Sequence, residues 1–347
     1  MAKGSYRVGV FGASSLLGKE LADELKESPM AALDVVLLDE EDATGQVIAA
    51  GDEATFIQRI EPVVLEGMEF VFFAGDAAST AKHWKSTRQV GASVVDLTYA
   101  LEREQDVVVR APWVSEALED ENGLELNLKT AGVVAAHPAA VMLALVLARL
   151  KDLDVQGCAA TVLEPASEHG REAMDELHQQ TVRLLSFQSL PREQYDAQIA
   201  FNLLPSVGSE AKVKFQATEE RIRAHYGLLS QGRLPELALQ LIQAPVFHGY
   251  AVSLMVKLAK EATVEAVETA LGQSHIDVVA EDSDPPSNVS AAGQEAILVR
   301  VRAEDAGSGK ARRFWLWLAA DNLKLAARNA IACAGELGRL RPQGKVQ

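Results

Sequence analysis

The stretch Val133-Val-Ala-Ala-His-Pro-Ala-Ala-Val-Met-Leu-Ala-Leu-Val-Leu-Ala-Arg-Leu150 decides how the chain is organised. Residues 133–136 are an apolar run typical of a buried strand, and Pro138 ends strand pairing but fits the first turn of a helix. From Ala139 onward the residues are apolar almost all round, which predicts a helix buried against a sheet. The free N–H groups at such a helix start stabilise anions, so α/β enzymes often hold a nucleophile there. Here the turn carries His137, Ala139 and Ala140, none of which supplies a thiol or a hydroxyl.

Composition predicts a globular protein with two domains. The chain has 347 residues, of which 48% are hydrophobic and 24% charged. The net charge of −16 argues against a nucleic-acid surface. The longest apolar run, 139–148, is too short to span a bilayer, and the N-terminus has no apolar core of the signal type, so we expect a cytoplasmic protein without a membrane role. Cys158 and Cys333 are the only cysteines and form no metal or redox motif.

A glycine turn follows the first predicted strand, residues 7–11. The turn reads Gly12-Ala-Ser-Ser-Leu-Leu-Gly18 and leads into a helix predicted from about residue 17 to 26. Its spacing is similar to the dinucleotide-binding fingerprint, in which the first glycine permits the turn and the last permits close helix packing. Ser15 stands where the middle glycine is expected and crowds the approach of a pyrophosphate, although its hydroxyl can donate to one. A plain strand-to-helix turn without a ligand is the alternative.

Further strands alternate with helices in the first part of the chain. Residues 33–38 predict a second strand, which ends in Asp39-Glu-Glu-Asp42. A carboxylate at this distance from the glycine turn is expected to bind the ribose of NAD and to disfavour a 2′-phosphate; the alternative is an acidic solvated loop. Residues 70–73 and 92–97 predict two more strands, and Gly75 lies in a second turn from strand to helix. The alternation indicates a mostly parallel sheet covered on both faces.

The second part of the chain has a different pattern. Strands are predicted at 153–163, 199–204, 246–258, 296–301 and 314–318, and helices at 170–185, 263–271 and 321–340. Several strands with few intervening helices indicate an α+β domain with an antiparallel or mixed sheet. Turn-rich loops are predicted at 281–288 and 306–310, and the final helix is expected to return to the first domain.

Taken together, the chain resembles the aspartate-semialdehyde dehydrogenase family from end to end, and most closely its divergent Usg-like branch, which lacks the catalytic cysteine. The resemblance is carried by Gly12 to Gly18, Gly170 to Leu177 with Gln179 to Thr181, Ala200 to Pro205, Gln243 to Phe247, and Asp321 to Lys324 with Arg328 to Ala330. It implies an α/β fold: a Rossmann-type NAD(P)-binding domain at 1–133, completed by the helix at 321–347, and an α+β dimerisation and catalytic-type domain at 134–320. It also implies a homodimer and a place in amino-acid biosynthesis.

The resemblance also assigns site positions. The cofactor-binding residues implied are Gly12, Ser14, Ser15, Leu16, Leu17, Gly18, Gly75 and Asn322. NADP or NAD is the implied cofactor: Asp39 favours NAD, whereas Ser14, Ser15 and the family favour NADP.

The family reduces an acyl phosphate to an aldehyde with NADPH through a cysteine thioester, and this chemistry needs a thiolate, a proton carrier and cations for the substrate. The family's cysteine falls on Ala140, with His137 and Ala139 at the two asparagines before it. Its glutamine falls on Glu164, whose charge would repel an anionic substrate. The catalytic histidine falls on Tyr250, the substrate-binding arginine on Gln243, and the phosphate-side arginine on Glu102. Lys214, or less favourably Lys212, is the remaining cation.

These replacements predict that the thioester chemistry is lost. Other cysteine, histidine and lysine residues are the candidate replacements. Cys158 and Cys333 are interpreted as core residues. His137 and Lys214 form a candidate anion site. His169, His248 and a carboxylate suggest a metal site only weakly, because no tight ligand motif accompanies them, and we predict none.

Two hypotheses follow. In one the chain is a regulatory or partner-binding protein that keeps the dimer surface and pairs with an active paralogue. In the other it is an enzyme with a different reaction built on His137, Glu164, His169 and Tyr250. A plain dehydrogenase ranks third.

Overall fold

The computed structural model describes residues 6–28, 34–50, 53–119, 126–127, 129–304 and 309–340. The chain divides into two compact units, each described below by itself. The first unit comprises Met1–Ala136 and Ala326–Gln347, and the second comprises His137–Leu325. The chain passes into the second unit directly before the buried helix that begins at Pro138. It returns to the first unit inside the last helix.

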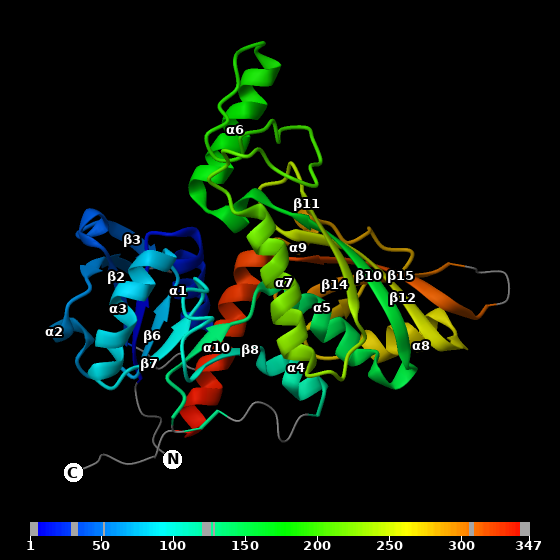
Figure 1. Cartoon of the computed structure of the whole chain (residues 1–347), viewed down its shortest axis with the longest axis horizontal. Helices are drawn as coiled ribbons and strands as arrows, with labels where there is room; N and C mark the ends of the chain where they lie inside the picture. Colours follow the sequence, from blue (N-terminus) through cyan, green and yellow to red (C-terminus); the bar gives the residue numbers. More distant parts are fainter. Residues whose placement is uncertain are drawn as a thin grey trace. The chain divides into compact units, whose positions relative to one another are not determined.

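The first unit is built on a parallel sheet of seven strands (Figure 1). The strand order is β5-β2-β1-β6-β7-β9-β8, and every described pair of neighbours is parallel. The strands are short apolar runs, as expected for a sheet covered on both faces, so the predicted parallel sheet is confirmed. The strand bounds are β1 Arg7–Phe11, β2 Asp34–Asp39, β5 Gln58–Arg59, β6 Phe70–Phe73, β7 Ser93–Asp96, β8 Val107–Arg110 and β9 Gly132–Ala135, with an antiparallel pair of β3 Val47–Ala50 and β4 Glu53–Phe56.

The helices of the first unit include the last helix of the chain. Their bounds are α1 Leu16–Glu27, η1 Glu41–Ala43, α2 Pro62–Leu65, α3 Ala77–Gln89, α4 Pro112–Ala117 and α10 Asn322–Leu340, the last beginning in the second unit. Small residues of α10, among them Ala327, Ala330 and Ala334, lie in the same apolar core as β1 and β6. The buried Arg110 forms two hydrogen bonds to Glu336 of α10, at 3.0 and 2.9 Å. The final helix thus completes the first unit.

The second unit contains a mixed sheet of six strands in the order β11-β10-β12-β15-β14-β13. The outer pairs β10 with β11 and β13 with β14 are parallel, whereas the three central pairs are antiparallel, so the predicted mixed sheet is confirmed. The strand bounds are β10 Val155–Glu164, β11 Leu237–Gln243, β12 Tyr250–Ala262, β13 Ile276–Val278, β14 Ile297–Ala303 and β15 Ala311–Ala320.

One face of this sheet is covered by helices. Their bounds, with those of the other helices of the unit, are α5 Pro138–Arg149, η2 Lys151–Leu153, η3 Ala166–His169, α6 Arg171–Leu185, α7 Phe215–Ser230, α8 Val264–Leu271 and α9 Asn288–Ala291. Every residue of α5 from Pro138 to Ala148 is buried, which confirms the predicted buried helix. α5 packs against α7 and α8, α7 also contacts β11, and α8 contacts β13 and β14.

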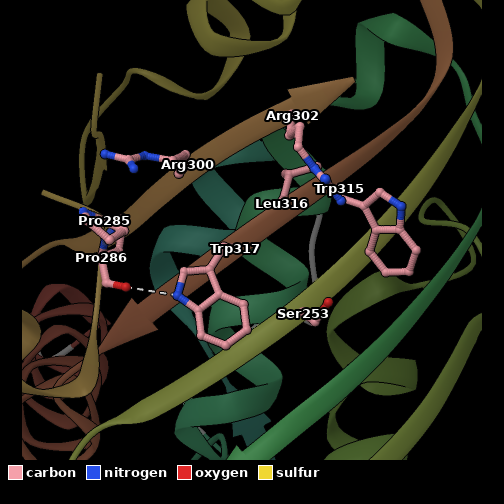
Figure 2. Close-up of a pocket in the computed structure, with 8 residues that line it drawn as sticks. All are labelled: Ser253, Pro285, Pro286, Arg300, Arg302, Trp315, Leu316 and Trp317. Atoms are coloured by element: carbon pink, nitrogen blue, oxygen red, sulfur yellow. Dashed lines mark hydrogen bonds between the residues drawn. The ribbon is translucent and has the colours of Figure 1, made fainter. Parts of the chain in front are cut away.

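The other face of the sheet exposes two tryptophans of β15. Trp315 and Trp317 are 36% and 37% exposed, whereas Phe314 and Leu316, which alternate with them, are buried. The register places Trp317 between Arg300 and Ser253 and places Trp315 next to Arg302. These residues line an open hollow of about 600 Å³, together with Pro285, Pro286 and Leu316 (Figure 2). The Trp317 indole donates to the Pro286 carbonyl at 2.8 Å, which holds the ring in place.

The predicted strand at 199–204 is wrong. Only Leu204 pairs with another segment, through an isolated bridge to Gln243. The N–H groups of Ile199 and Ala200 instead donate to the Gln180 side-chain oxygen, at 2.8 and 3.2 Å, and Phe201 has a left-handed backbone with φ of 58°. Neither feature is compatible with a strand.

Other differences concern boundaries and omissions. The strand predicted from residue 246 begins at Tyr250, because Gly249 has φ of 83°. The sequence patterns missed α7, β8 and β11, and also the short elements β3, β4, β5, β13, α2, α4 and α9. Residue 33 of the second predicted strand and residues 306–308 of a predicted loop lie outside the described residues.

Candidate functional site

The glycine turn of the first unit joins β1 to α1 and touches the turn after β6. Gly12 has φ of 84°, and a Cβ there would overlap the backbone of Gly75, so the first turn needs glycine for the two turns to approach each other. A Cβ at Gly18 would overlap the Gly12 carbonyl. Ser15 caps α1: its hydroxyl accepts from the Gly18 N–H and donates to the Ala74 carbonyl, both at 2.8 Å. The hydroxyl therefore organises the turn itself.

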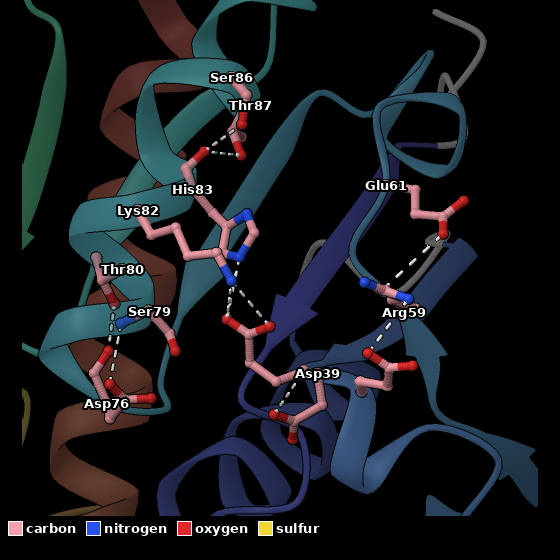
Figure 3. Close-up of polar contacts among 12 residues, drawn as sticks. Asp39, Arg59, Glu61, Asp76, Ser79, Thr80, Lys82, His83, Ser86 and Thr87 are labelled. Carbon is pink, nitrogen blue, oxygen red and sulfur yellow. Dashed lines mark hydrogen bonds and ion pairs between the residues drawn. The ribbon is translucent and has the colours of Figure 1, made fainter.

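The start of α1 offers free N–H donors. Leu16 and Leu17 are its first two residues, and their N–H groups donate to no other residue in the described part of the chain. At the second turn the Asp76 carboxylate caps α3 by accepting from the Ser79 N–H at 2.9 Å (Figure 3). The start of α1 therefore binds an anion better than the start of α3, because Asp76 at the start of α3 repels an anion. The first turn fits the pyrophosphate of a dinucleotide.

In the second unit the start of α5 is occupied by His137. Its ring Nδ1 accepts from the Ala139 N–H at 3.2 Å and so caps the helix. The backbone N–H of His137 donates to His225 Nδ1 of α7 at 2.9 Å. His137 and Ala140 are fully buried. The helix start predicted to hold an anion therefore presents an imidazole.

The anion beside this imidazole is the chain's own Glu168. A Glu168 carboxylate oxygen lies 3.0 Å from His137 Nε2, and the Tyr250 hydroxyl also hydrogen-bonds to this carboxylate. Burial raises the pKa of Glu168, but His137, His169 and Tyr250 outweigh it and lower the pKa to about 2. The ring of His137 also lies 6.2 Å from that of Tyr250, between centroids.

A second buried pair joins Glu164, the last residue of β10, to His169 at the end of η3. The distance from His169 Nε2 to Glu164 Oε2 is 2.9 Å. Burial lowers the pKa of His169, but the charge and hydrogen bond of Glu164, together with Glu168, raise it overall. The carboxylate of Glu164 thus lies against a histidine whose pKa it raises. Of the residues proposed for a replacement reaction, the structure brings together His137 with Tyr250 and Glu164 with His169.

Three further polar groups near these pairs were not anticipated as site residues. His225 was missed, as was Tyr195, whose ring lies 6.3 Å from that of His169. Burial and the carboxylates of Glu164 and Glu176 raise the pKa of the Tyr195 phenol, which keeps it protonated. Glu168, which lies 3.0 Å from His137, is the third, and no site role is predicted for it from the sequence. Its place in Ser167-Glu-His169, directly after a strand end, was the available signal.

Gln243, Lys214 and Asn322 belong to neither pair. Gln243 Nε2 donates to the carbonyls of Glu164 and Ala244, both at 3.1 Å, so its amide is used by the backbone. Lys214 is exposed directly before α7. The Asn322 side-chain oxygen accepts from the Ser167 hydroxyl at 3.1 Å and from the Gly249 N–H at 3.0 Å, inside the second unit.

The residues that the structure describes contain no group of three or more His, Cys, Asp or Glu placed to hold a metal ion. None of the helices described combines the length and the apolar composition that crossing a bilayer requires.

Comparisons with known proteins agree with this architecture. The model for the NAD binding domain of semialdehyde dehydrogenases matches residues 7–120, and the model for their dimerisation domain matches residues 147–325. A USG-1 protein homologue of Pseudomonas aeruginosa is 31% identical over 332 residues, which cover 95% of this chain and 96% of the relative. Aspartate-semialdehyde dehydrogenase of Rickettsia bellii is 22% identical over 338 residues, covering 96% of this chain and 97% of the relative.

Solved structures give the same result. A probable aspartate-semialdehyde dehydrogenase from Pseudomonas aeruginosa superposes with a TM-score of 0.81 at 30% identity, covering 96% of this chain and 98% of that one. Aspartate semialdehyde dehydrogenase II of Vibrio cholerae has a TM-score of 0.82 at 22% identity, covering 97% and 99%, and this likeness shows the fold. The chain therefore belongs to the semialdehyde dehydrogenase family, as a Usg-like relative of the aspartate-semialdehyde dehydrogenases.

Proposed function

We propose that this chain is a homodimeric, dinucleotide-binding protein that keeps the family scaffold and has lost the thioester dehydrogenase reaction. The observation that carries the proposal is Ala140 at the start of α5, where the family places its nucleophile. Its methyl group cannot form a thioester, and it is fully buried.

No other thiol compensates in this proposal. Cys158 lies within β10, where burial raises its pKa to about 11, and its thiol donates to the Glu236 carbonyl at 3.4 Å. Cys333 lies in α10 of the first unit, and burial raises its pKa as well. A thiol with a raised pKa supplies little thiolate at neutral pH.

The base and the substrate cation are replaced too. At the base position Tyr250 is fully buried and bonded to Glu168, and at the arginine position the neutral Gln243 is bonded to backbone carbonyls. Because proton transfer and substrate binding also lack their groups, restoring the thiol alone should not restore turnover.

The direct test measures nicotinamide absorbance with aspartate semialdehyde, phosphate and either NADP or NAD. We expect no substrate-dependent change for the natural chain or for Ala140→Cys. Aspartate semialdehyde dehydrogenase II of Vibrio cholerae serves as the active control. Steady turnover by the natural chain, or appreciable turnover by Ala140→Cys, would refute the proposed loss of function.

Dinucleotide binding is supported by the glycine turn and the free N–H groups of Leu16 and Leu17, in a segment that matches an NAD-binding family model. When bound, a nicotinamide supplies or accepts a hydride. In this proposal the turn binds the pyrophosphate, as either a structural or a sensing ligand.

Dimerisation is proposed through the exposed face of the mixed sheet. The segment matches a family model described as a dimerisation domain, and Trp315 and Trp317 present large apolar surfaces on that face. Tryptophan and arginine are enriched where protein surfaces pair, and here both tryptophans have arginine neighbours on β14. Light scattering should give a mass of twice 37.3 kDa.

The second candidate is an enzyme with another reaction, favoured by the two buried His–Glu pairs. His137 with Glu168, and His169 with Glu164, each join a proton carrier to a carboxylate. His137 and Glu164 are fully buried, however, which favours a structural role for the pairs in this form of the protein. A regulatory protein that pairs with an active paralogue is consistent with the first proposal, and co-purification with that paralogue would identify it.

A further inference from the structure

The end of β2 and the glycine turn are bonded to each other through Asp39. One carboxylate oxygen of Asp39 accepts from the Ser14 N–H at 2.9 Å, and the other accepts from the Glu40 N–H at 3.0 Å. The Leu38 carbonyl accepts from the N–H groups of Gly12 and Ala13, at 2.9 and 3.1 Å. The carboxylate is thus fixed beside the turn that precedes the free N–H groups of α1.

Asp39 retains acceptor capacity in this position. Each oxygen of a carboxylate accepts about two hydrogen bonds, and the backbone uses one on each oxygen. The remaining acceptor sites suit the two hydroxyl groups of a ribose, and they repel a phosphate ester at the same place.

The next residue, Glu40, contacts two basic side chains of this edge. Its carboxylate contacts Lys82 Nζ at 3.1 and 3.3 Å and His83 Nε2 at 3.1 Å, both from α3 (Figure 3). Partial burial raises the pKa of Glu40, but the hydrogen bonds from Lys82, His83 and Ser79 lower it overall. Glu40 is therefore ionised at neutral pH and occupies both basic side chains.

Arg59, at the same edge, also contacts carboxylates. Arg59 lies 3.5 Å from Glu41 and 4.0 Å from Glu61. Residues 39–42 are all acidic. In the part of the chain that the structure describes, the cations contacting this segment are already paired with its carboxylates, and the segment carries a net negative charge. A 2′-phosphate, with about −1.5 to −2 charge at pH 7, finds an acidic environment here.

Ser15 offers no compensation for a phosphate. Its hydroxyl already accepts from Gly18 and donates to Ala74. The charges at the end of β2 therefore decide between a 2′-hydroxyl and a 2′-phosphate.

We propose that the dinucleotide site of this chain selects NAD(H) over NADP(H), with Asp39 accepting the ribose hydroxyls and Glu40 withholding Lys82 and His83 from a 2′-phosphate. This inference rests on the proposed function, because it assumes that the glycine turn binds a dinucleotide.

The test is calorimetric titration of the full-length protein with NAD and NADP separately, and its readout is the ratio of the two dissociation constants. We expect NAD to bind at least tenfold more tightly. Glu40→Gln frees Lys82 and His83 and should lower this preference at least fivefold. Asp39→Asn keeps an acceptor for Ser14 but loses the charge, and should also lower the preference at least fivefold. Asp42→Asn, an exposed acid of the same segment, is the matched control and should change it less than twofold.

Two results would overturn this inference without affecting the proposed function. One is NADP binding at least as tightly as NAD. The other is a preference for NAD that neither Glu40→Gln nor Asp39→Asn changes, when both variants keep the circular dichroism spectrum of the natural chain. Binding of neither dinucleotide by the folded natural protein would instead overturn the dinucleotide-binding part of the proposed function, and this inference with it. The two failures are therefore distinguishable.

Discussion

Replacing Glu168 by glutamine is expected to destabilise the second unit by about 3 kcal/mol at pH 7. The carboxylate lies 3.0 Å from His137 Nε2 and also bonds the Tyr250 hydroxyl. Glutamine keeps the shape of the side chain but removes its charge. The fully buried His137 would then lose the carboxylate that its Nε2 contacts.

The magnitude follows from the pKa of Glu168. Burial raises this pKa, but His137, His169 and Tyr250 together lower it from 4.5 to about 2. A difference of one in pKa corresponds to about 1.4 kcal/mol, so the fold favours the charged carboxylate over the neutral one by about 3 kcal/mol. Glutamine approximates the neutral form.

The effect should depend on pH in a defined direction. A depressed pKa in the folded state contributes stability that is present in full above the unfolded value of 4.5 and is lost as the pH falls toward 2. The difference between the natural chain and Glu168→Gln should therefore shrink as the pH falls below about 4.

Urea unfolding followed by circular dichroism, at one protein concentration, measures the free energy of unfolding at pH 7, 5.5 and 3.5. Glu193→Gln removes the same charge from an exposed residue and should change the free energy of unfolding by less than about 0.5 kcal/mol. A loss below about 1 kcal/mol for Glu168→Gln at pH 7, or a loss that stays constant down to pH 3.5, contradicts the reasoning.

Three further predictions concern other parts of the chain. Gly12→Ala should cost at least about 2 kcal/mol more than Gly45→Ala in urea unfolding, because both glycines have φ near 83° but only Gly12 meets backbone within 4 Å; equal costs would contradict this. Trp317→Glu should convert the dimer to a monomer by light scattering, whereas Val63→Glu, on an exposed residue of α2, should not; a Trp317→Glu dimer would exclude the sheet face as the interface. Because burial raises the pKa of Cys158 to about 11, this thiol should react with a disulfide reagent at pH 8 at least about 100-fold more slowly in the folded chain than in urea; equal rates would show an accessible thiolate.

The alternation of strand and helix in the first unit was readable because each element is signalled by its own residues. The apolar run Phe70–Phe73, the turn at Gly75 and the helix capped by Asp76 follow one another directly, and all three were found as expected. Local patterns suffice where neighbouring residues determine the backbone.

Sequence reasoning failed where a distant side chain determines the backbone. The apolar segment at 199–204 satisfies a strand pattern. However, the Ile199 N–H donates to the side chain of Gln180, which lies in a helix 19 residues earlier in the sequence. Strand β11, which pairs with β10 from Cys158 to Glu164, and helix α7, which supplies His225, were not identified either. Strand β11 and helix α7 are stabilised by packing against β10 and α5. These contacts join residues far apart in the sequence, so no local pattern reveals them.

The candidate site divides in the same way. The residues predicted at the family positions, including Ala140, Glu164 and Tyr250, follow from the order of motifs, because a residue's type and place along the chain need no fold. Only the tertiary structure decided that the Glu164 carboxylate contacts His169 and that the Glu168 carboxylate contacts His137. Ion pairs depend on distances of a few ångströms between side chains of different elements, and these distances exist only once the sheet and its helices have packed.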